Sequence, residues 1–223
     1  MAGLARRAAA EAIGTLFLLA AVVGSGIMGE RLSGGNVAIA LLANAIATGA
    51  VLTALILTFG PISGAHFNPA VTLAEAAWRS FAWRDVPVYV LAQVGGAFGG
   101  VAIANVMFEL PIFFVSQRAR FGLPQLFSEF IATLGLLAVI RGCARGRTAA
   151  IPFAVGAYIT GAYWFTASTS FANPAVTLAR SMSNTFSGIR PLDVPGFIAF
   201  QLLGAAAAVL LFRWLEAEFA QER

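Results

Sequence analysis

The sequence has 223 residues, of which 59% are hydrophobic and only 11% are charged, and its formal net charge is +4. Soluble domains are about a quarter charged, so this composition excludes a soluble globular protein and predicts an integral membrane protein. All 14 basic residues are arginine, which indicates loop arginines that set membrane topology, and we expect no nucleic-acid partner.

Six apolar segments are long enough to cross a hydrocarbon core of about 30 Å, which requires about 20 helical residues. Two further helical stretches are about half as long and cannot cross it. In chain order the six spans cover approximately 9–29, 37–59, 86–108, 124–142, 149–168 and 194–214, and the two half-spans cover 69–78 and 174–182.

The chain contains a repeat. EAIGTLFLL, from Glu11, resembles EFIATLGLL, from Glu129, and the heptapeptide NPAVTLA occurs at both 68–74 and 173–179. The two repeats cover about 9–108 and about 124–214, and each holds three spans and one half-span. Because an odd number of spans reverses direction, the second repeat is inverted relative to the first. The sequence therefore predicts an all-α integral membrane protein with one channel domain over 1–223.

Each NPAVTLA copy is predicted to start a helix near the middle of the membrane. Asparagine is a good N-cap, and proline is favoured at the first helical position. A helix of about ten residues is about 15 Å long, half the hydrocarbon thickness, so the two N-termini of an inverted repeat meet near the midplane. The expected centre of a pore is therefore formed by Asn68, Pro69, Ala70, Asn173, Pro174 and Ala175.

The backbone in front of each half-helix is expected to line that pore, because irregular backbone at this depth is tolerated only where it is buried or faces a watery cavity. Carbonyl groups then act as acceptors, the side-chain amides of Asn68 and Asn173 act as donors, and the two positive helix ends repel cations and protons. Such a path suits small uncharged solutes that carry hydroxyl groups. The expected lining residues are Gly64, Ala65, His66, Phe171 and Ala172.

These motifs resemble those of the aquaporin (major intrinsic protein) family. SGAHFNPAVT at 63–72 matches the family's first pore-loop signature, and the resemblance covers nearly the whole chain. It implies an aquaporin-like bundle of six transmembrane helices plus two re-entrant half-helices, assembled as a homotetramer with one pore per subunit. It also implies that Glu11 and Glu129 are scaffold residues that hold the pore loops by hydrogen bonds. We expect no enzymatic activity, no cofactor and no metal.

The resemblance also implies a constriction on the outer side of the pore, at positions set by their spacing from the two asparagines. These positions are Thr48, Gly161, Ser170 and Val176. Most family members have arginine where this chain has Val176, and none of the four residues is aromatic, so we expect a wide filter. Water, glycerol-like solutes, urea and uncharged metalloid hydroxides such as arsenite fit it. The sequence looks like bacterial aquaglyceroporin-like channels associated with arsenic resistance, whose substrates extend to organoarsenicals.

Arg180 lies four residues beyond Val176, on the same helix face and one turn further out. Two hypotheses are open for its role. It projects into the outer vestibule and attracts oxygen-rich solutes, or it stabilises the C-terminal end of the half-helix at the membrane interface. Glu75 occupies the equivalent place in the first copy, with the same two hypotheses.

The arginines predict an orientation with both termini in the cytoplasm. Nine then lie inside, at 6, 7, 79, 84, 141, 145, 147, 213 and 223, and five outside, at 31, 118, 120, 180 and 190. This distribution fits the positive-inside rule, and we expect a multi-pass protein of the cell inner (plasma) membrane.

The alternative function is a secondary transporter, because inverted repeats and broken helices are also found in transporters. A transporter would need a coupling acid near the midplane. The two candidates, Glu11 and Glu129, match scaffold positions of the family, which favours a channel.

Overall fold

The structure is a computed structural model, and it describes residues 2–217. The described chain forms six long helices and two short ones. The long helices are α1 Leu4–Leu32, α2 Val37–Ser63, α4 Val86–Met107, α5 Leu123–Ala144, α6 Ile151–Phe165 and α8 Val194–Leu215, and the short ones are α3 Pro69–Ala77 and α7 Pro174–Arg180. Single 3-10 turns precede α4, α6 and α8, namely η1 Trp83–Asp85, η2 Thr148–Ala150 and η3 Pro191–Asp193.

All eight predicted helical segments are present, and the helix most shortened relative to its prediction is α6. The sequence predicts a span over 149–168, but the α-helix has 15 residues and ends at Phe165. The backbone becomes extended at Thr166, with φ −110° and ψ 139°, because the loop that leads to α7 begins there. By length and hydropathy, five of the described helices are long and apolar enough to cross a membrane by themselves, and α6 is not among them.

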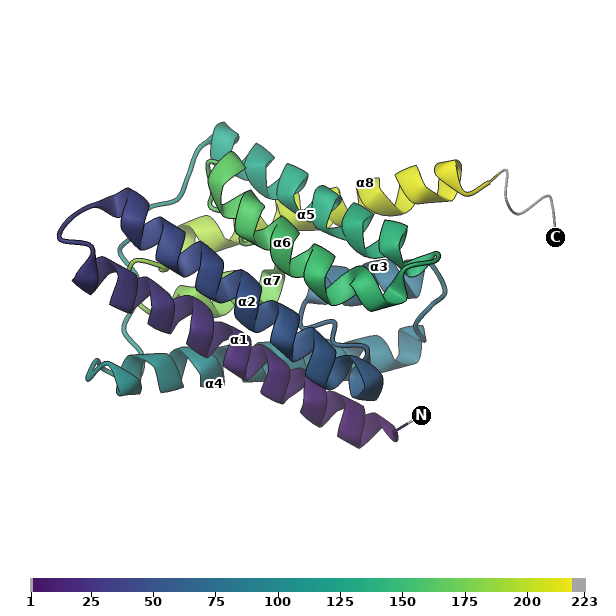
Figure 1. Cartoon of the computed structure of the whole chain (residues 1–223), viewed down its shortest axis with the longest axis horizontal. Coiled ribbons are helices and arrows are strands. Elements are labelled where there is room, and N and C mark those ends of the chain that lie inside the picture. Colours follow the sequence, from purple (N-terminus) through teal and green to yellow (C-terminus); the bar gives the residue numbers. More distant parts are fainter. Residues whose placement is uncertain (1, 218–223) are drawn as a thin grey trace.

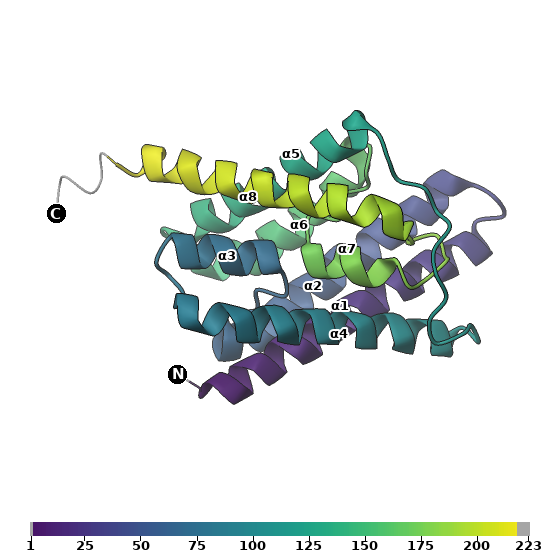
Figure 2. The ribbon, with the colours of Figure 1, turned by 180° about the vertical axis from the view of Figure 1, so that it is seen from behind.

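The helices form two halves that are joined along α2 and α6. In the first half α1 packs against α2 and α4, and in the second half α5 packs against α8 and α6 (Figure 1). The two short helices lie end to end between α4 and α8, as Figure 2 shows. The start of α1 and the end of α8 lie at the same end of the bundle, as an even number of crossings requires.

One close helix contact is repeated in both halves. A Cβ atom added to Gly96 of α4 would lie 2.1 Å from the carbonyl oxygen of Ala12 in α1. A Cβ atom added to Gly204 of α8 would lie 2.4 Å from the carbonyl oxygen of Phe130 in α5. Both values are far below van der Waals distance, so glycine is required where these backbones meet. The sequence repeat therefore extends to helix packing.

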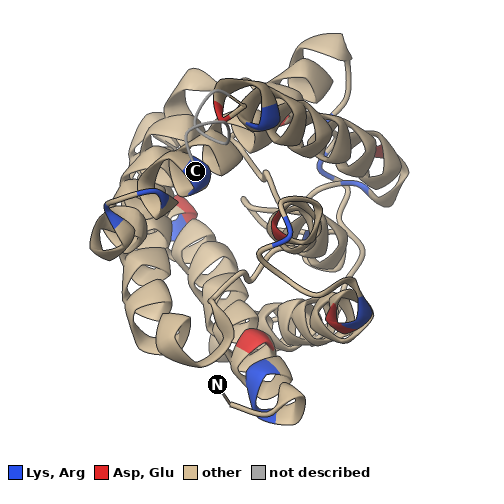
Figure 3. Ribbon diagram, turned by 90° about the vertical axis from the view of Figure 1, so that its right-hand side faces the viewer, with Lys and Arg blue, Asp and Glu red and all other residues tan. Residues whose placement is uncertain are grey.

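The described arginines lie in loops and in the first or last turns of helices, and not in the middle of the long helices. Figure 3 looks onto the end where α1 begins and shows long stretches of helix without charged residues. At this end Arg213 donates to the carbonyl of Ala77, at the C-terminus of α3, over 2.8 Å. Arg223 lies outside the described residues. Which end faces the cytoplasm stays a prediction.

A salt bridge joins α5 to the end of α8. Arg141 donates to both carboxylate oxygens of Glu216, over 2.9 and 2.6 Å, and this pairing lowers the pKa of Glu216 below its usual value. A carboxyl group whose folded-state pKa is lowered stabilises the fold above its unfolded pKa, and the contribution is lost as pH falls through the folded pKa.

We expect Glu216→Gln to lower the free energy of unfolding by about 1 kcal/mol at pH 7, since the pair is partly solvated. The measurement is thermal unfolding in detergent. The difference between variant and parent is expected to shrink as pH falls through the folded pKa of Glu216, and a difference that stays constant in acid would contradict the assignment.

Candidate functional site

The two half-helices begin as the NPA tripeptides predict. The side-chain oxygen of Asn68 accepts a hydrogen bond from the N–H of Ala70 (2.9 Å), and that of Asn173 accepts from Ala175 (3.0 Å) and Val176 (3.2 Å). Proline occupies the first turn in both cases. Each asparagine therefore satisfies N–H groups that would otherwise be unpaired at a helix start.

The same two asparagines link the half-helices to each other. The side-chain Nδ2 of Asn68 donates to the carbonyl of Ala172 over 2.7 Å, and the Nδ2 of Asn173 donates to the carbonyl of Phe67 over 2.8 Å. Each amide thus uses one of its two protons on the opposite loop and keeps one for another acceptor. The sequence predicts both amides as donors at the pore centre. The structure shows that one N–H of each amide links the two pore loops.

Two buried carboxylates hold the pore loops. Glu11 accepts from the N–H groups of His66 (3.0 Å) and Phe67 (2.7 Å). Glu129 accepts from the N–H groups of Phe171 and Ala172, both over 2.9 Å. Both glutamates are fully buried, and with these partners they act on the loops that precede the asparagines, as the family resemblance implies.

A glutamine and a threonine complete each carboxylate network in the same way. Gln93 donates through Nε2 to Glu11 and to the hydroxyl of Thr72. Gln201 donates through Nε2 to Glu129 and to the hydroxyl of Thr177. The two networks occupy equivalent positions in the two repeats, so the inverted repeat reproduces individual hydrogen bonds.

The pore loops contain backbone in the left-handed region at equivalent positions. Ala65 and Phe67 have φ values of 50° and 49°, and Ser170 and Ala172 have φ values of 50° and 46°. Residues other than glycine adopt this region at a cost of about 1–3 kcal/mol each and persist there only where the surroundings enforce it. The glutamate hydrogen bonds provide that constraint and turn the carbonyl groups away from regular helix positions.

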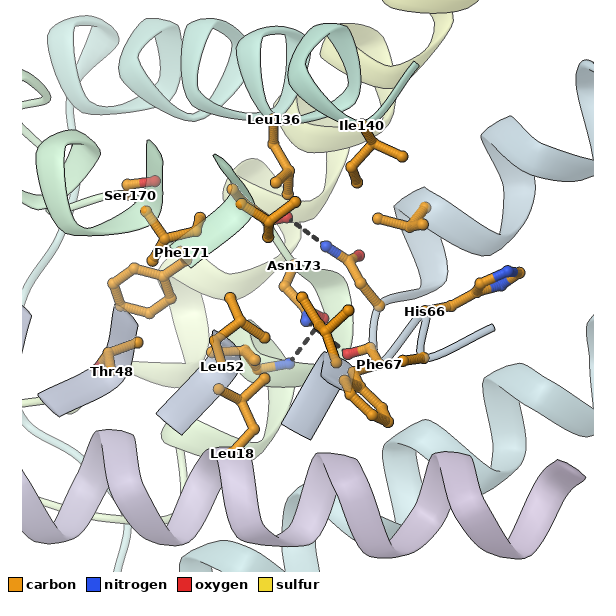
Figure 4. A pocket seen from close by; sticks show the side chains of 18 of the residues that line it. Leu18, Thr48, Leu52, His66, Phe67, Leu136, Ile140, Ser170, Phe171 and Asn173 are labelled. Atoms are coloured by element: carbon orange, nitrogen blue, oxygen red, sulfur yellow. Dashed lines mark hydrogen bonds between the residues drawn. The ribbon is translucent and has the colours of Figure 1, made fainter. Parts of the chain in front are cut away.

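A cavity of about 300 Å³ runs past the asparagines. In Figure 4, Thr48, Ser170 and Phe171 lie at one end of it, His66 lies toward the other, and Asn173 lies between them. Most of the predicted pore residues line this cavity, namely Thr48, Gly64, Ala65, His66, Asn68, Ser170, Phe171, Ala172, Asn173, Val176 and Arg180. Four others are buried in the half-helices behind the wall, namely Pro69, Ala70, Pro174 and Ala175.

The sequence model described as Major intrinsic protein matches residues 2–163 of this chain. The chain belongs to the major intrinsic protein family. Its expected six-helix, two-half-helix bundle is the architecture seen here. Members of the family are passive channels, and the chain is accordingly a multi-pass membrane channel of the aquaglyceroporin kind.

Individual relatives agree with the family assignment. Aquaglyceroporin AqpS of Rhizobium meliloti (strain 1021) is 56% identical over 212 residues, which are 95% of this chain and 91% of that protein. Aquaporin NIP6-1 of Arabidopsis thaliana is 36% identical over 140 residues, which are 62% of this chain and 45% of that protein. The X-ray structure of the aquaglyceroporin from Plasmodium falciparum matches with a TM-score of 0.78, covering 99% of this chain and 100% of that chain at 19% identity. This likeness shows the fold.

The predicted placement of Gly161 in the filter is wrong. Gly161 is exposed and is not part of the cavity wall, whereas Ile159 and Tyr163 are buried and line the cavity. Residues four apart share a helix face, and the residue midway between them points to the opposite side. Tyr163 therefore stands where the family pattern suggests Gly161, and its hydroxyl lies 3.2 Å from that of Thr48. The filter region of this family member is not free of aromatic side chains.

Arg120 is a buried residue that sequence reasoning missed. It lies in the loop between α4 and α5, and its guanidinium donates to the carbonyls of Gly188 (2.8 Å), Ser168 (3.1 Å) and Phe186 (3.3 Å). Burial, followed by the charges of Arg180 and Arg118, lowers the pKa of Arg120 to about 9. No spacing rule connects this loop to the pore, because the contacts join segments that are about 50 to 70 residues apart in sequence.

Glu75 and His66 line the cavity toward the end where α1 begins. His66 Nδ1 lies 3.1 Å from the hydroxyl of Thr72, so the histidine ring is held inside the pore-loop network. Of the two hypotheses for Glu75, a place on the cavity wall is therefore the one observed. The C-terminal end of α3 is stabilised by Arg213, which donates to the carbonyl of Ala77.

Proposed function

We propose that this chain is a passive channel with a wide filter that lacks the usual arginine. Its solutes are water, glycerol-like polyols, urea and uncharged metalloid hydroxides such as arsenite, and they extend to organoarsenicals. It works as a homotetramer in the cell inner (plasma) membrane, with both termini in the cytoplasm. One channel domain covers 1–223, with repeats over about 9–108 and 124–214.

The observation that carries this proposal is the wall of the cavity at Val176. This valine lies on the wall together with Thr48 and Ser170, three small or medium side chains, where most family members narrow the path with arginine. A volume of about 300 Å³ is at the lower end of the range for small-molecule sites and is far more than one water molecule requires. Tyr163 adds one aromatic wall to this region and one hydroxyl for polar solutes.

The positions of the half-helices support selection for uncharged solutes. Two helix N-termini directed at one point present positive ends of their dipoles to the path, which disfavours cations. The carbonyls of the pore loops and the remaining amide protons of Asn68 and Asn173 offer polyols both acceptors and donors. A solute that exchanges its water for such groups enters with a small desolvation cost.

The test is solute flux into proteoliposomes, measured by stopped-flow swelling with water, glycerol, urea and arsenite. We expect flux of all four, independent of a proton gradient and not saturating in the millimolar range. A pore that passes only water would contradict the wide filter. Flux that saturates and follows a proton gradient would favour the secondary transporter.

Val176→Arg is expected to reduce glycerol permeability by about tenfold or more, because a long side chain fills the path and brings a second charge close to Arg180. Water permeability is expected to fall less, since water needs a narrower path. Val176→Leu is the matched control, with a larger apolar side chain and no charge. Equal glycerol fluxes in the arginine variant and the parent would contradict the placement of Val176 at the narrow part of the path.

A further inference from the structure

Arg180 is one of the largest fully enclosed side chains in the described protein, with 2% of its surface exposed, and it lines the cavity. Its guanidinium carbon lies 3.4 Å from the centre of the Phe171 ring. Its Nε donates to the carbonyl of Ser187. The side chain is thus fixed at two points, by a ring on the pore loop and by a carbonyl in the segment that follows α7.

The rest of the guanidinium has no protein partner. Among the described residues, the structure shows no hydrogen bond from Nη1 or Nη2 of Arg180 and no carboxylate within salt-bridge distance of it. A buried guanidinium carries five N–H donors, and leaving donors unsatisfied away from water is costly. The wall of the cavity therefore contains a fixed positive charge with unused donors.

Arg120 is a second buried arginine beside the Phe171 ring, and each nitrogen of its guanidinium is hydrogen-bonded. It is 7% exposed, and all three of its guanidinium nitrogens donate to carbonyls, those of Gly188, Ser168 and Phe186. Its guanidinium lies 5.0 Å from the centre of the same Phe171 ring. Arg120 thus uses all its guanidinium nitrogens in hydrogen bonds within the protein, whereas Arg180 faces the cavity with unpaired N–H donors.

Other polar side chains lie at the same end of the cavity. The hydroxyl of Ser170 is buried and has no hydrogen-bond partner among the described residues. The hydroxyls of Thr48 and Tyr163 pair only with each other, over 3.2 Å. In Figure 4, Ser170, Phe171 and Thr48 lie together at this end. The carboxylate of Glu129 accepts from the pore loop and from Gln201, and among the described residues it forms no salt bridge with Arg180.

We propose that Arg180, with Ser170 and the Thr48–Tyr163 pair, forms a binding site in the pore for small solutes that carry an oxyacid group. The terminal N–H groups of a guanidinium match two oxygens of a carboxylate, or of a tetrahedral oxyacid, in a two-point contact. The face of Phe171 fixes the plane of the guanidinium, so little side-chain entropy is lost on binding. This inference rests on the proposed function, because it assigns a preferred solute class to the same pore.

The site resolves the two hypotheses for Arg180. A residue that stabilised the half-helix end at the membrane interface would direct its donors to the last carbonyls of α7 or to the lipid headgroups. The observed donor instead reaches Ser187, and the guanidinium lies inside the protein. The positive charge is therefore retained on the cavity wall one helical turn beyond Val176.

The experiment measures inhibition of glycerol flux by two oxyacids, acetate for the planar group and methylphosphonate for the tetrahedral one. Proteoliposomes are assayed at pH 7 and constant ionic strength, and binding of the same acids to the detergent-solubilised protein is measured by calorimetry. The variants are Arg180→Met, Arg180→Lys and Ser170→Ala. The matched control is Arg118→Met, which removes a positive charge from the same region but not from the cavity wall.

We expect one or both acids to inhibit the parent protein, and Arg180→Met to raise the half-inhibiting concentration by about tenfold or more, the loss typical of a charged hydrogen bond. Arg180→Lys keeps the charge without the two-point contact and is expected to lie in between. Ser170→Ala is expected to weaken inhibition by about threefold, as for a neutral hydrogen bond. Arg118→Met is expected to stay within about twofold of the parent, because its charge is screened by solvent.

The proposal is overturned if neither acid inhibits or binds, or if Arg180→Met and Arg118→Met respond alike. If Arg180→Met does not fold, as judged by size-exclusion chromatography, unchanged inhibition in both Arg180→Lys and Ser170→Ala overturns it. Inhibition by only one acid supports the site and identifies the oxyacid geometry. A parent that binds the acids through Arg180 but passes no glycerol would overturn the proposed function and leave the site standing.

Discussion

Glu11→Gln is expected to lower the free energy of unfolding by about 3–6 kcal/mol, the sum of two hydrogen bonds to a charged group. The glutamate is fully buried and accepts from four donors, two at each carboxylate oxygen. A glutamine keeps one of those oxygens and replaces the other by an amino group. The N–H of Phe67 and the Nε2 of Gln93 then face a donor instead of an acceptor, and both lose their partner. Thermal unfolding in detergent measures the loss.

The double variant Glu11→Gln, Gln93→Glu is the matched control for this prediction. The carboxylate at position 93 accepts from the new amide, so one of the two lost hydrogen bonds is restored, and we expect recovery of about half of the destabilisation. Glu129→Gln in the parent is expected to lower the free energy of unfolding by less, because Glu129 accepts three hydrogen bonds from the described residues and Glu11 accepts four. A Glu11→Gln protein that unfolds at the parent temperature would show that the carboxylate does not hold the pore loop.

The scaffold could be predicted because its signals are local in sequence or repeated along it. An apolar span has a length that the bilayer dictates, an Asn-Pro pair has a position that a helix start dictates, and the inverted repeat fixes the relation between Asn68 and Asn173. The pore loops then follow, since each loop has to connect a span to a half-helix at the midplane. The cavity-lining residues of both loops were identified on that basis.

The filter could not be predicted fully because it depends on where one helix ends. Gly161 lies twelve residues before Asn173. That position faces the filter only if the intervening loop has the family's usual length and the helix keeps its register. Here α6 ends at Phe165 and the cavity-facing stripe of α6 passes through Tyr163 instead. A spacing rule copies residue positions along the chain, whereas a pore wall is set by which helix face turns inward.

The arginines beside Phe171 show a second limit of sequence reasoning. Arg120 and Arg180 have the same side chain and contact the same ring, yet one has all its guanidinium nitrogens bonded and the other only Nε. That difference depends on the carbonyl groups of Ser168, Phe186 and Gly188, which are distant in sequence from Arg120. The chemical role of a buried arginine is therefore decided by unsatisfied donors, which appear only in three dimensions.

Gly96→Ala is expected to lower the free energy of unfolding by at least the roughly 1–3 kcal/mol typical of an overpacked core, whereas Gly95→Ala is not. The added methyl group at position 96 meets the backbone of α1, with the carbonyl oxygen of Ala12 only 2.1 Å away, and a backbone cannot rotate out of the way as a side chain can. At position 95 a Cβ atom meets nothing within 4 Å. The helix preference of alanine over glycine makes that change neutral or stabilising by up to about 1 kcal/mol.

Comparing Gly96→Ala with Gly95→Ala also tests the link between helix packing and the pore, because α1 carries Glu11 next to the contact residue Ala12. Forcing α1 away from α4 moves the carboxylate away from the pore loop that it holds, so the stability loss of Gly96→Ala is expected to be accompanied by a fall in glycerol flux. Gly95→Ala is expected to leave both unchanged within about twofold for flux and about 1 kcal/mol for stability. Equal unfolding temperatures for the two variants would mean that α1 and α4 are not held at the observed separation. Helix packing and pore geometry would then be independent, contrary to the network that joins Glu11, Gln93 and Thr72.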